Sequence, residues 1–126
     1  MAGLTLDSGA LIGYERNDRS VVVQIKAALQ MGIDVTVPAV VLAEVWRGGP
    51  RAARLARILS SCIVADTDES QALKAGEAIA QVSGAGTVDA LVMASAATRG
   101  DTVLTGDFQD LSRLRAAFAM VRVVRI

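Results

Sequence analysis

The chain contains no histidine, and this absence excludes several kinds of catalytic site. Without an imidazole there is no Ser-His-Asp or Cys-His nucleophilic site and no His-based acid–base cleavage. Zinc sites are disfavoured as well, because they use histidine or several cysteines and Cys62 is the only cysteine. A lone cysteine cannot form an internal disulfide, so we interpret Cys62 as a small buried hydrophobe in a reducing cytoplasm.

Aromatic residues, long apolar runs and net charge are scarce too. Only 3% of the 126 residues are aromatic, so the core must be built from aliphatic side chains and alanine. The longest apolar run, 35–43, is interrupted by Thr36 and Pro38 and is shorter than the about 20 residues of a membrane helix. The amino terminus has no basic region before an apolar stretch, so we expect no signal peptide and a cytoplasmic protein without membrane contact. The formal net charge is zero, so any affinity for nucleic acid must come from local patches or a second chain.

The order of apolar patterns predicts an α/β fold in a single domain that spans residues 1–126. Short β-branched segments are typical of strands, and we expect them at 4–6, 33–37, 62–65, 101–105 and 120–125. Helical spacing is expected at 21–29, 39–46, 51–60, 69–82 and 87–98, with a loop and short helix at 107–117. Such alternation favours a mostly parallel sheet covered on both faces, with ligands at the carboxyl ends of the strands.

Four carboxylates fall at or near that edge. Asp7 follows the first strand and Asp107 the fourth, while Glu44 lies inside an apolar helix and Asp89 in the first turn of another. Converging carboxylates repel each other unless a cation neutralises them. Oxygen ligands without His or Cys select Mg²⁺ or Mn²⁺, and the natural chemistry of such a site is phosphoryl transfer to water.

Each carboxylate also has an ordinary structural explanation. Asp7 could be the N-cap of a helix that follows it, Asp89 could complement a helix dipole, and Asp107 could be a turn residue. Glu44 is harder to explain this way, because an unpaired carboxylate in an apolar helix is costly, and its alternative partner is Arg47 at i+3.

Two further aspartates lie near these carboxylates in the sequence or at the same strand. Asp110, three residues after Asp107, either adds a contact to a metal-bound water or caps the helix at Leu111. We assign Asp101 to a turn with Gly100.

The motifs together resemble the PIN-domain nucleases, and within them the VapC-type toxins of bacterial toxin–antitoxin pairs. The similarity covers almost the whole chain and rests on the segments 6–11, LDSGAL; 40–45, VVLAEV; 88–96, VDALVMASA; and 103–107, VLTGD. The resemblance implies a three-layer fold with a five-stranded parallel sheet between helices. It implies that Asp7, Glu44, Asp89 and Asp107 hold Mg²⁺ or Mn²⁺, and that the protein hydrolyses RNA to leave a 5′-phosphate.

The resemblance also assigns smaller roles. Thr105 matches the family's Thr-x-Asp step and would orient a ligand or the fourth carboxylate, and Ser8 matches a small hydroxyl position beside the first aspartate. Gly9 departs from the Ser or Thr more often found there, which puts the local hydrogen bonding in doubt and not the metal site. The implied partner is a cognate VapB-type antitoxin whose C-terminal segment packs into a groove, and such toxins commonly form homodimers.

Arginines recur after Glu44, and they are the candidates for RNA binding. Arg47, Arg51, Arg54 and Arg57 form either a phosphate-tracking strip or a solvated helix face, and the break at 48–50 separates Arg47 from the other three. Phe108 is a candidate for base stacking.

Three other functions compete with this one. A phosphorylated receiver domain would need paired acids after the first strand and a lysine after the last, but Asp7 stands alone and the only lysines are Lys26 and Lys74. A PIN-like binding module without catalysis and a nuclease directed at DNA remain as alternatives.

Overall fold

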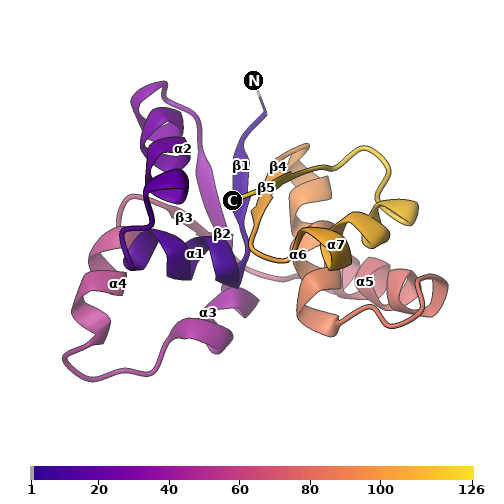
Figure 1. Ribbon diagram of the computed structural model, residues 1–126. Coiled ribbons are helices and arrows are strands. Elements are labelled where there is room, and N and C mark those ends of the chain that lie inside the picture. Colours follow the sequence, from indigo (N-terminus) through magenta and orange to yellow (C-terminus); the bar gives the residue numbers. More distant parts are fainter. Residues whose placement is uncertain (1) are drawn as a thin grey trace.

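The computed structural model describes residues 2–126 and shows a parallel five-stranded sheet between helices (Figure 1). The strand order is β3-β2-β1-β4-β5, and every neighbouring pair is parallel. The strands are β1 Leu4–Leu6, β2 Val35–Pro38, β3 Ile63–Ala65, β4 Thr102–Thr105 and β5 Arg122–Arg125. The predicted fold class is therefore confirmed, and all five expected strands are present with small shifts at their ends.

The helices form the two outer layers. Helices α1 and α2 pack on one face of the sheet with α4 beside α1, and α6 covers the other face with α5 and α7 against it (Figure 1). Helix α3 contacts both α1 and α6. The helices are α1 Ser8–Glu15, α2 Arg19–Gln30, α3 Ala39–Val45, α4 Ala52–Leu59, α5 Glu69–Gln81, α6 Thr87–Arg99 and α7 Phe108–Arg113, followed by the 3-10 helix η1 Leu114–Ala116.

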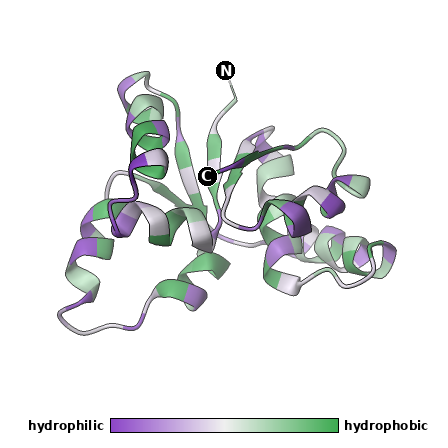
Figure 2. Ribbon diagram, viewed as in Figure 1, coloured by the Kyte–Doolittle hydropathy of each residue, from purple (hydrophilic) through white to green (hydrophobic). Residues whose placement is uncertain are grey.

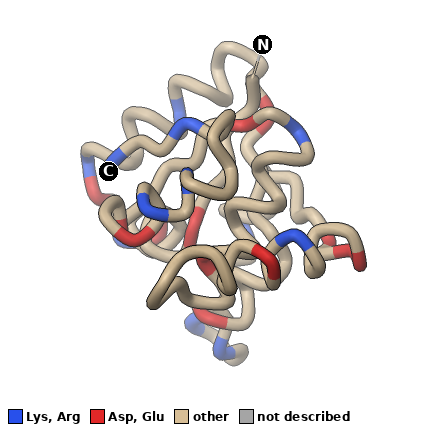
Figure 3. Tube along the Cα trace, turned by 90° about the vertical axis from the view of Figure 1, so that its right-hand side faces the viewer, with Lys and Arg blue, Asp and Glu red and all other residues tan. Residues whose placement is uncertain are grey.

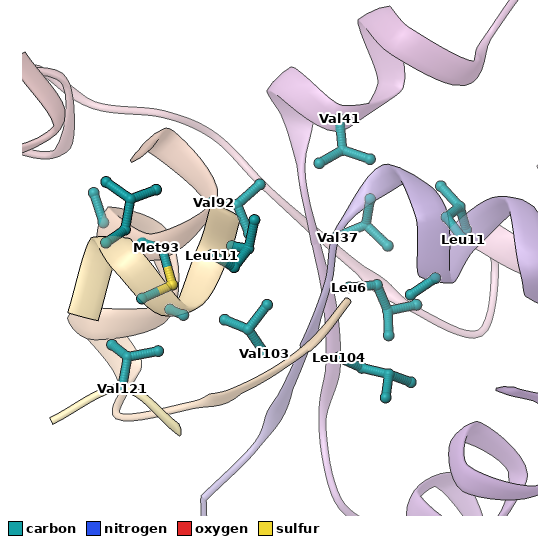
Figure 4. Packing of buried hydrophobic residues seen from close by; sticks show 14 of the residues in the cluster. Leu6, Leu11, Val37, Val41, Val92, Met93, Val103, Leu104, Leu111 and Val121 are labelled. Atoms are coloured by element: carbon teal, nitrogen blue, oxygen red, sulfur yellow. The ribbon is translucent and has the colours of Figure 1, made fainter. Parts of the chain in front are cut away.

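Alternation along the strands separates two apolar layers. Successive strand side chains point to opposite faces, so Leu104 lies with Leu6 and Leu11 while Val103 lies with Met93 (Figure 4). Apolar residues accordingly line the sides of the helices that meet the sheet, and polar residues lie outward (Figure 2). This sandwich buries both faces of the central strands, whereas the edge strand β3 leaves Ile63 48% and Val64 42% exposed.

Aspartate side chains begin three of the helices. The Asp7 side chain accepts a hydrogen bond from Ala10 N, and Asp18 and Asp68 act in the same way on α2 and α5. Each satisfies one of the backbone N–H groups that a helix start leaves unpaired. Helix α6 instead ends at Gly100, whose φ of 71° is the left-handed conformation that glycine adopts readily.

Two predictions about single residues need refinement. Cys62 packs against the core but is only partly buried, and burial raises the pKa of its thiol. The predicted turn of Gly100 and Asp101 is confirmed, because Asp101 N donates to Ala96 O at 3.0 Å behind the left-handed Gly100. The Asp101 side chain is also 4% exposed and accepts a hydrogen bond from Thr5 Oγ1 at 2.7 Å, which the turn alone does not predict.

Charges of both signs are distributed over the surface. In Figure 3, basic and acidic positions are interspersed along the chain trace rather than gathered into separate halves. Within residues 2–126, no helix combines the length and the apolar character needed to span a bilayer.

Candidate metal centre

Asp7 is held rigidly at the carboxyl end of β1. It is 4% exposed, and its Oδ1 accepts hydrogen bonds from Ala10 N at 2.8 Å and Gly106 N at 3.3 Å. Its Oδ2 accepts a hydrogen bond from Thr105 Oγ1. An ionised carboxylate has about four lone pairs, so three of them are engaged and one on Oδ2 is left for a cation. The helix-capping role of Asp7 and a ligand role are therefore compatible.

Thr105 connects the first and fourth acidic residues. Its buried hydroxyl donates to Asp7 Oδ2 and accepts a hydrogen bond from Asp107 N at 2.7 Å. The hydroxyl uses its single proton on one side and a lone pair on the other. Strand β4 thereby sets the position of the backbone at Asp107 relative to the Asp7 carboxylate.

Three aspartates form the closest acidic group in the described chain. Asp89 at the start of α6 and Asp107 and Asp110 at the start of α7 each offer one carboxylate oxygen, and these three oxygens lie within 4.8 Å of one another. The group joins the start of α6, which follows α5, to the start of α7, which follows β4. Its place agrees with the rule that open α/β sheets bind ligands beyond the carboxyl ends of their strands.

The electrostatic cost of this grouping is concentrated on Asp89. Burial, followed in order of importance by the charges of Asp107, Asp7, Asp110 and Glu44, raises the pKa of its carboxyl to about 6. Every influence therefore disfavours the ionised form. Such a half-buried carboxylate, surrounded by others, is the condition that a bound cation relieves.

The pKa values of Asp7 and Asp107 are raised for similar reasons. Burial raises the pKa of Asp7 although hydrogen bonds from Thr105, Ala10 and Gly106 oppose it. Burial also raises the pKa of Asp107, followed by its hydrogen bond and charge interaction with Asp110. Each hydrogen bond to Asp7 favours the charged form and so offsets part of the effect of burial.

Asp110 has an additional partner. Its Oδ1 accepts a hydrogen bond from Arg113 Nη2 at 2.9 Å, and Arg113 also donates to Ser83 O at 2.8 Å. Neither of the two predicted roles for Asp110 included this ion pair. The i,i+3 spacing within α7 is the sequence signal that could have revealed it.

Glu44 lies at the rim of the site and not in an apolar environment. The expectation that its apolar helix makes an unpaired carboxylate costly does not hold, because Glu44 is exposed on α3. Its charge still raises the pKa values of Asp7 and Asp89, which places it within electrostatic reach of both. Its expected partner Arg47 instead donates to Ala43 O and Trp46 O.

The donor set fits a hard divalent cation. Opposite ligands of Mg²⁺ lie about 4.2 Å apart, twice its oxygen distance of about 2.1 Å. The three carboxylate oxygens within 4.8 Å of one another are on this scale, and Asp7 lies within electrostatic reach of Asp89. All the ligands are oxygens, the set that Mg²⁺ and Mn²⁺ prefer.

Comparison with known protein families identifies the family of the chain. The model of the PIN domain family matches residues 4–117, which includes every carboxylate of the site. The chain belongs to the PIN domain family. The resemblance deduced from the four sequence motifs is confirmed at this level. No curated protein matches the sequence closely enough to count as a relative.

Solved structures share the PIN fold over nearly the full length. The VapBC2 complex from Rickettsia felis, bound to a DNA fragment from its promoter, contains a chain with a TM-score of 0.82 and 14% identity, covering 98% of each chain. DNA-bound VapBC from Salmonella typhimurium gives a TM-score of 0.78 at 18% identity, covering 99% of this chain and 98% of that one. FitAcB from Neisseria gonorrhoeae gives 0.70 at 19%, covering 95% of each. At these identities the likeness shows the fold alone.

Sequence reasoning missed a close backbone contact in this PIN domain. A Cβ added to Gly9 would lie 2.9 Å from Gly106 Cα and 3.1 Å from Gly106 N. Helix α1 thus approaches the loop after β4 because neither residue has a side chain at the contact. The departure at Gly9 therefore has a structural reason, and the same approach brings Gly106 N to Asp7.

Sequence reasoning also missed Arg16. A hollow of about 410 Å³ is lined by Arg16, Arg47 and Arg51 together with Glu15, so Arg47 does share a surface with Arg51. Arg54 and Arg57 lie further along α4 and do not line it. Ser8 is the first residue of α1. Phe108 is partly buried under Arg125, whose guanidinium carbon lies 4.7 Å from the ring centroid.

Proposed function

We propose that this PIN domain is a metal-dependent endoribonuclease that acts as the toxin of a VapBC-type toxin–antitoxin pair. The observation that carries the proposal is the meeting of Asp89, Asp107 and Asp110 beside a buried, hydrogen-bonded Asp7. Asp7, Asp89, Asp107 and Asp110 would hold Mg²⁺ or Mn²⁺, with the exposed Glu44 on α3 as a further carboxylate ligand. When bound, the ion supplies charge neutralisation and Lewis-acid chemistry for phosphodiester hydrolysis.

Individual residues of the chain would have distinct roles in this site. Asp7 and Thr105 keep one carboxylate fixed while the site is loaded, because the Asp7 oxygens are held by three donors. Asp89 contributes the carboxylate that gains most from neutralisation. Arg113 holds Asp110 in an ion pair and limits the negative charge that faces an incoming phosphate.

RNA would be held by the arginines beside α3. The hollow lined by Arg16, Arg47 and Arg51 lies at the end of α1 away from Asp7, about 12 Å along an eight-residue helix. Ser8 and Arg54 extend this proposed substrate contact toward the carboxylates and along α4. In a chain with no net charge, such a local group of guanidinium ions is the means of binding a polyanion.

The first experiment measures cleavage of single-stranded RNA by the purified protein. We expect cleavage with Mg²⁺ or Mn²⁺, none in EDTA, and a loss of about 100-fold or more in Asp7→Asn and Asp89→Asn. Each cut should leave a 5′-phosphate, whereas a contaminating metal-independent ribonuclease leaves a 2′,3′-cyclic phosphate. Full activity in EDTA would refute the metal mechanism. A DNA strand of the same sequence and a binding assay in parallel identify a DNA-directed nuclease or a module that binds without cleaving.

The partner proposal rests on an apolar surface of α3 and α4. Leu42, Ala43, Trp46 and Leu59 line a hollow of about 440 Å³, and Trp46 is 42% exposed. An aromatic residue at the centre of an apolar patch is typical of a protein-binding site. We propose that a VapB-type antitoxin binds here and that the toxin itself is a homodimer in the cytoplasm.

Growth and co-purification test the biological role. Expression of the wild-type chain should arrest growth, and Asp7→Asn should relieve the arrest. If Asp7→Asn is as toxic as the wild type, RNA cleavage is not the cause of the growth arrest. Co-expression with the neighbouring short reading frame should restore growth and yield a stable complex, whereas Trp46→Ala should weaken that complex without altering RNA cleavage. Sedimentation of the isolated toxin measures the proposed dimer.

A further inference from the structure

A polar cluster of three buried residues and the partly exposed side chain of Arg99 lies away from the proposed metal ligands and contains none of them. Arg99 Nε donates to Asp101 Oδ2 at 2.9 Å, and its Nη2 donates to Thr5 Oγ1 at 2.9 Å and Ser95 Oγ at 3.0 Å. Thr5 Oγ1 completes the cluster by donating to Asp101 Oδ2 at 2.7 Å. Thr5, Ser95 and Asp101 are 0%, 1% and 4% exposed. We call these four residues the Arg99 clamp.

The clamp joins the three elements from which the site is built. Thr5 lies on β1, two residues before Asp7. Ser95 and Arg99 lie on α6, whose first turn holds Asp89. Asp101 immediately precedes β4, which leads to Thr105 and Asp107. Each element therefore links part of the clamp to part of the proposed metal centre, which follows Thr5 and Asp101 along the chain and precedes the clamp residues on α6.

Small residues make up much of the buried surface of α6. Ala90, Ala94 and Ala96 are buried together with the larger Val92 and Met93. Interdigitating ridges and grooves fix the register of a packed helix, and alanines form shallow ones. Directional hydrogen bonds from a planar guanidinium add to the register that Val92 and Met93 provide. Ser95 lies six residues after Asp89, about 9 Å along the helix axis.

The backbone around the clamp is shaped to hold it. A Cβ added to Gly3 would lie 2.6 Å from Asp101 Oδ1 and 3.0 Å from Asp34 O. Gly3 O also accepts a hydrogen bond from Thr102 N at 3.0 Å, beside Asp101. The Asp101 carboxylate can reach Thr5 and Arg99 only because Gly3 leaves room for it.

We propose that Thr5 and Arg99 are positioning residues: their clamp sets the place of α6 against β1 and β4, and so the place of Asp89 relative to Asp7. The proposal rests on the proposed function, since it concerns the metal centre of that same site. An error of about 1 Å in the placement of a catalytic group can cost about 100-fold in rate. Groups that orient metal ligands typically change affinity or activity by about 10–100-fold.

Neighbouring threonines provide a matched test. Thr5 and Thr36 are paired in register on β1 and β2, and both are buried, but Thr36 Oγ1 has no hydrogen-bond partner within the described residues. Thr5→Val and Thr36→Val remove the same hydroxyl from adjacent strands with almost no change in shape. Only the first breaks the clamp, and it leaves the Arg99–Asp101 ion pair intact.

The experiment measures Mn²⁺ affinity by titration of the metal-free protein, together with kcat and KM for RNA cleavage. Thr5→Val should weaken Mn²⁺ binding and lower kcat by about 10–100-fold while KM for RNA stays near the wild-type value, because the arginine surface is untouched. Thr5→Ser should restore both quantities, and Gly3→Ala, which displaces Asp101, should repeat the defect. Thr36→Val should behave as wild type.

The possible outcomes separate the two proposals. Wild-type Mn²⁺ affinity and kcat in Thr5→Val would overturn the positioning role while the proposed function stands. Equal losses in Thr5→Val and Thr36→Val would overturn it too, since a general loosening of the sheet would then be the cause. A wild-type protein that neither binds Mn²⁺ nor cleaves RNA would refute the proposed function and this inference with it.

Discussion

Asp89 is the residue on which the geometry of the site places the largest electrostatic burden. Burial and four acidic neighbours raise its pKa to about 6, whereas the same group in an unfolded chain titrates near about 3.9. Folding therefore favours the protonated form. As pH rises through this interval, the folded state loses stability relative to the unfolded state, because the unfolded chain releases its proton first.

Asp89→Asn should consequently stabilise the metal-free protein at neutral pH. Partial exposure screens the repulsion, so we expect a gain of about 1 kcal/mol and a rise in Tm of about 4 °C at pH 7.5 in EDTA. The difference from wild type should shrink toward zero near pH 4, where Asp89 is protonated. Thermal unfolding at a series of pH values measures it.

Glu69→Gln is the matched control for that substitution. Glu69 occupies the first turn of α5 as Asp89 occupies the first turn of α6, but it is exposed. Losing a negative charge at a helix start should lower Tm slightly or leave it unchanged. A fall in Tm for Asp89→Asn at pH 7.5 would mean that helix-dipole stabilisation outweighs the repulsion.

Gly9 tests the close approach of α1 to the loop after β4. In Gly9→Ala the new methyl group would lie 2.9 Å from a backbone atom of Gly106, so backbone must move. We expect a loss of about 1–3 kcal/mol in the free energy of unfolding. The control is Gly76→Ala on α5, where nothing lies within 4 Å of the added methyl and helix propensity should add about 0.5–1 kcal/mol. Urea unfolding measures both changes in the free energy of unfolding. A stabilisation by Gly9→Ala, as for Gly76→Ala, would contradict the steric explanation.

At the scale of elements, periodicity predicted most of the fold and much less of the side-chain environment. The apolar spacing of 87–98 predicted α6, which extends over Thr87–Arg99, and the strands at 4–6 and 101–105 were placed closely. The spacing of 39–46 predicted α3 as well, but not that Glu44 lies on its exposed side. An apolar helix has no polar face by which the outward direction can be recognised.

Contacts between distant segments were beyond the sequence for a different reason. Asp7 could be grouped with Asp89 and Asp107 through the family resemblance, and strand order gives a physical reason for it. The Arg99 clamp joins residues 94 or more positions apart as well as local ones. No periodicity links Thr5 to Asp101, and Arg16 similarly meets Arg47 only after α1 and α3 have packed.

The arginine that precedes α4 allows a prediction about RNA binding. Arg51 lines the arginine hollow together with Arg16 and Arg47. Arg51→Gln should weaken RNA binding and lower the slope of log K against log salt by about 0.7, the value for one lost phosphate contact on a single strand. The slope is measured from RNA binding at several salt concentrations, with both proteins carrying Asp7→Asn so that the RNA is not cleaved. Lys26→Gln on exposed α2 removes an equal charge elsewhere and should leave the slope unchanged; equal effects would indicate a non-local attraction.

The whole molecule couples folding to the charge of its site. The chain carries no net charge, so overall repulsion does not govern its stability, but the carboxylates at the edge of the sheet raise one another's pKa values. A cation that binds the folded site and not the unfolded chain should stabilise the fold by mass action. The same ion should reverse the pH trend, because ligation needs ionised carboxylates.

Mn²⁺ should therefore raise Tm, and more so at pH 7.5 than at pH 5. At a concentration of about 100 times Kd the gain is about 2.7 kcal/mol, or about 10 °C for a domain of this size. At pH 5 the proton on Asp89, with its pKa of about 6, competes with the ion and lowers the apparent affinity about tenfold.

Scanning calorimetry with Mn²⁺ or EDTA at both pH values measures the shift in Tm, with NaCl at matched ionic strength to correct for screening. Asp89→Asn should lose most of the Mn²⁺ effect at pH 7.5. A shift of equal size at the two pH values, or one reproduced by NaCl, would mean that the aspartates are not ligands and that Mn²⁺ acts only by screening their charge.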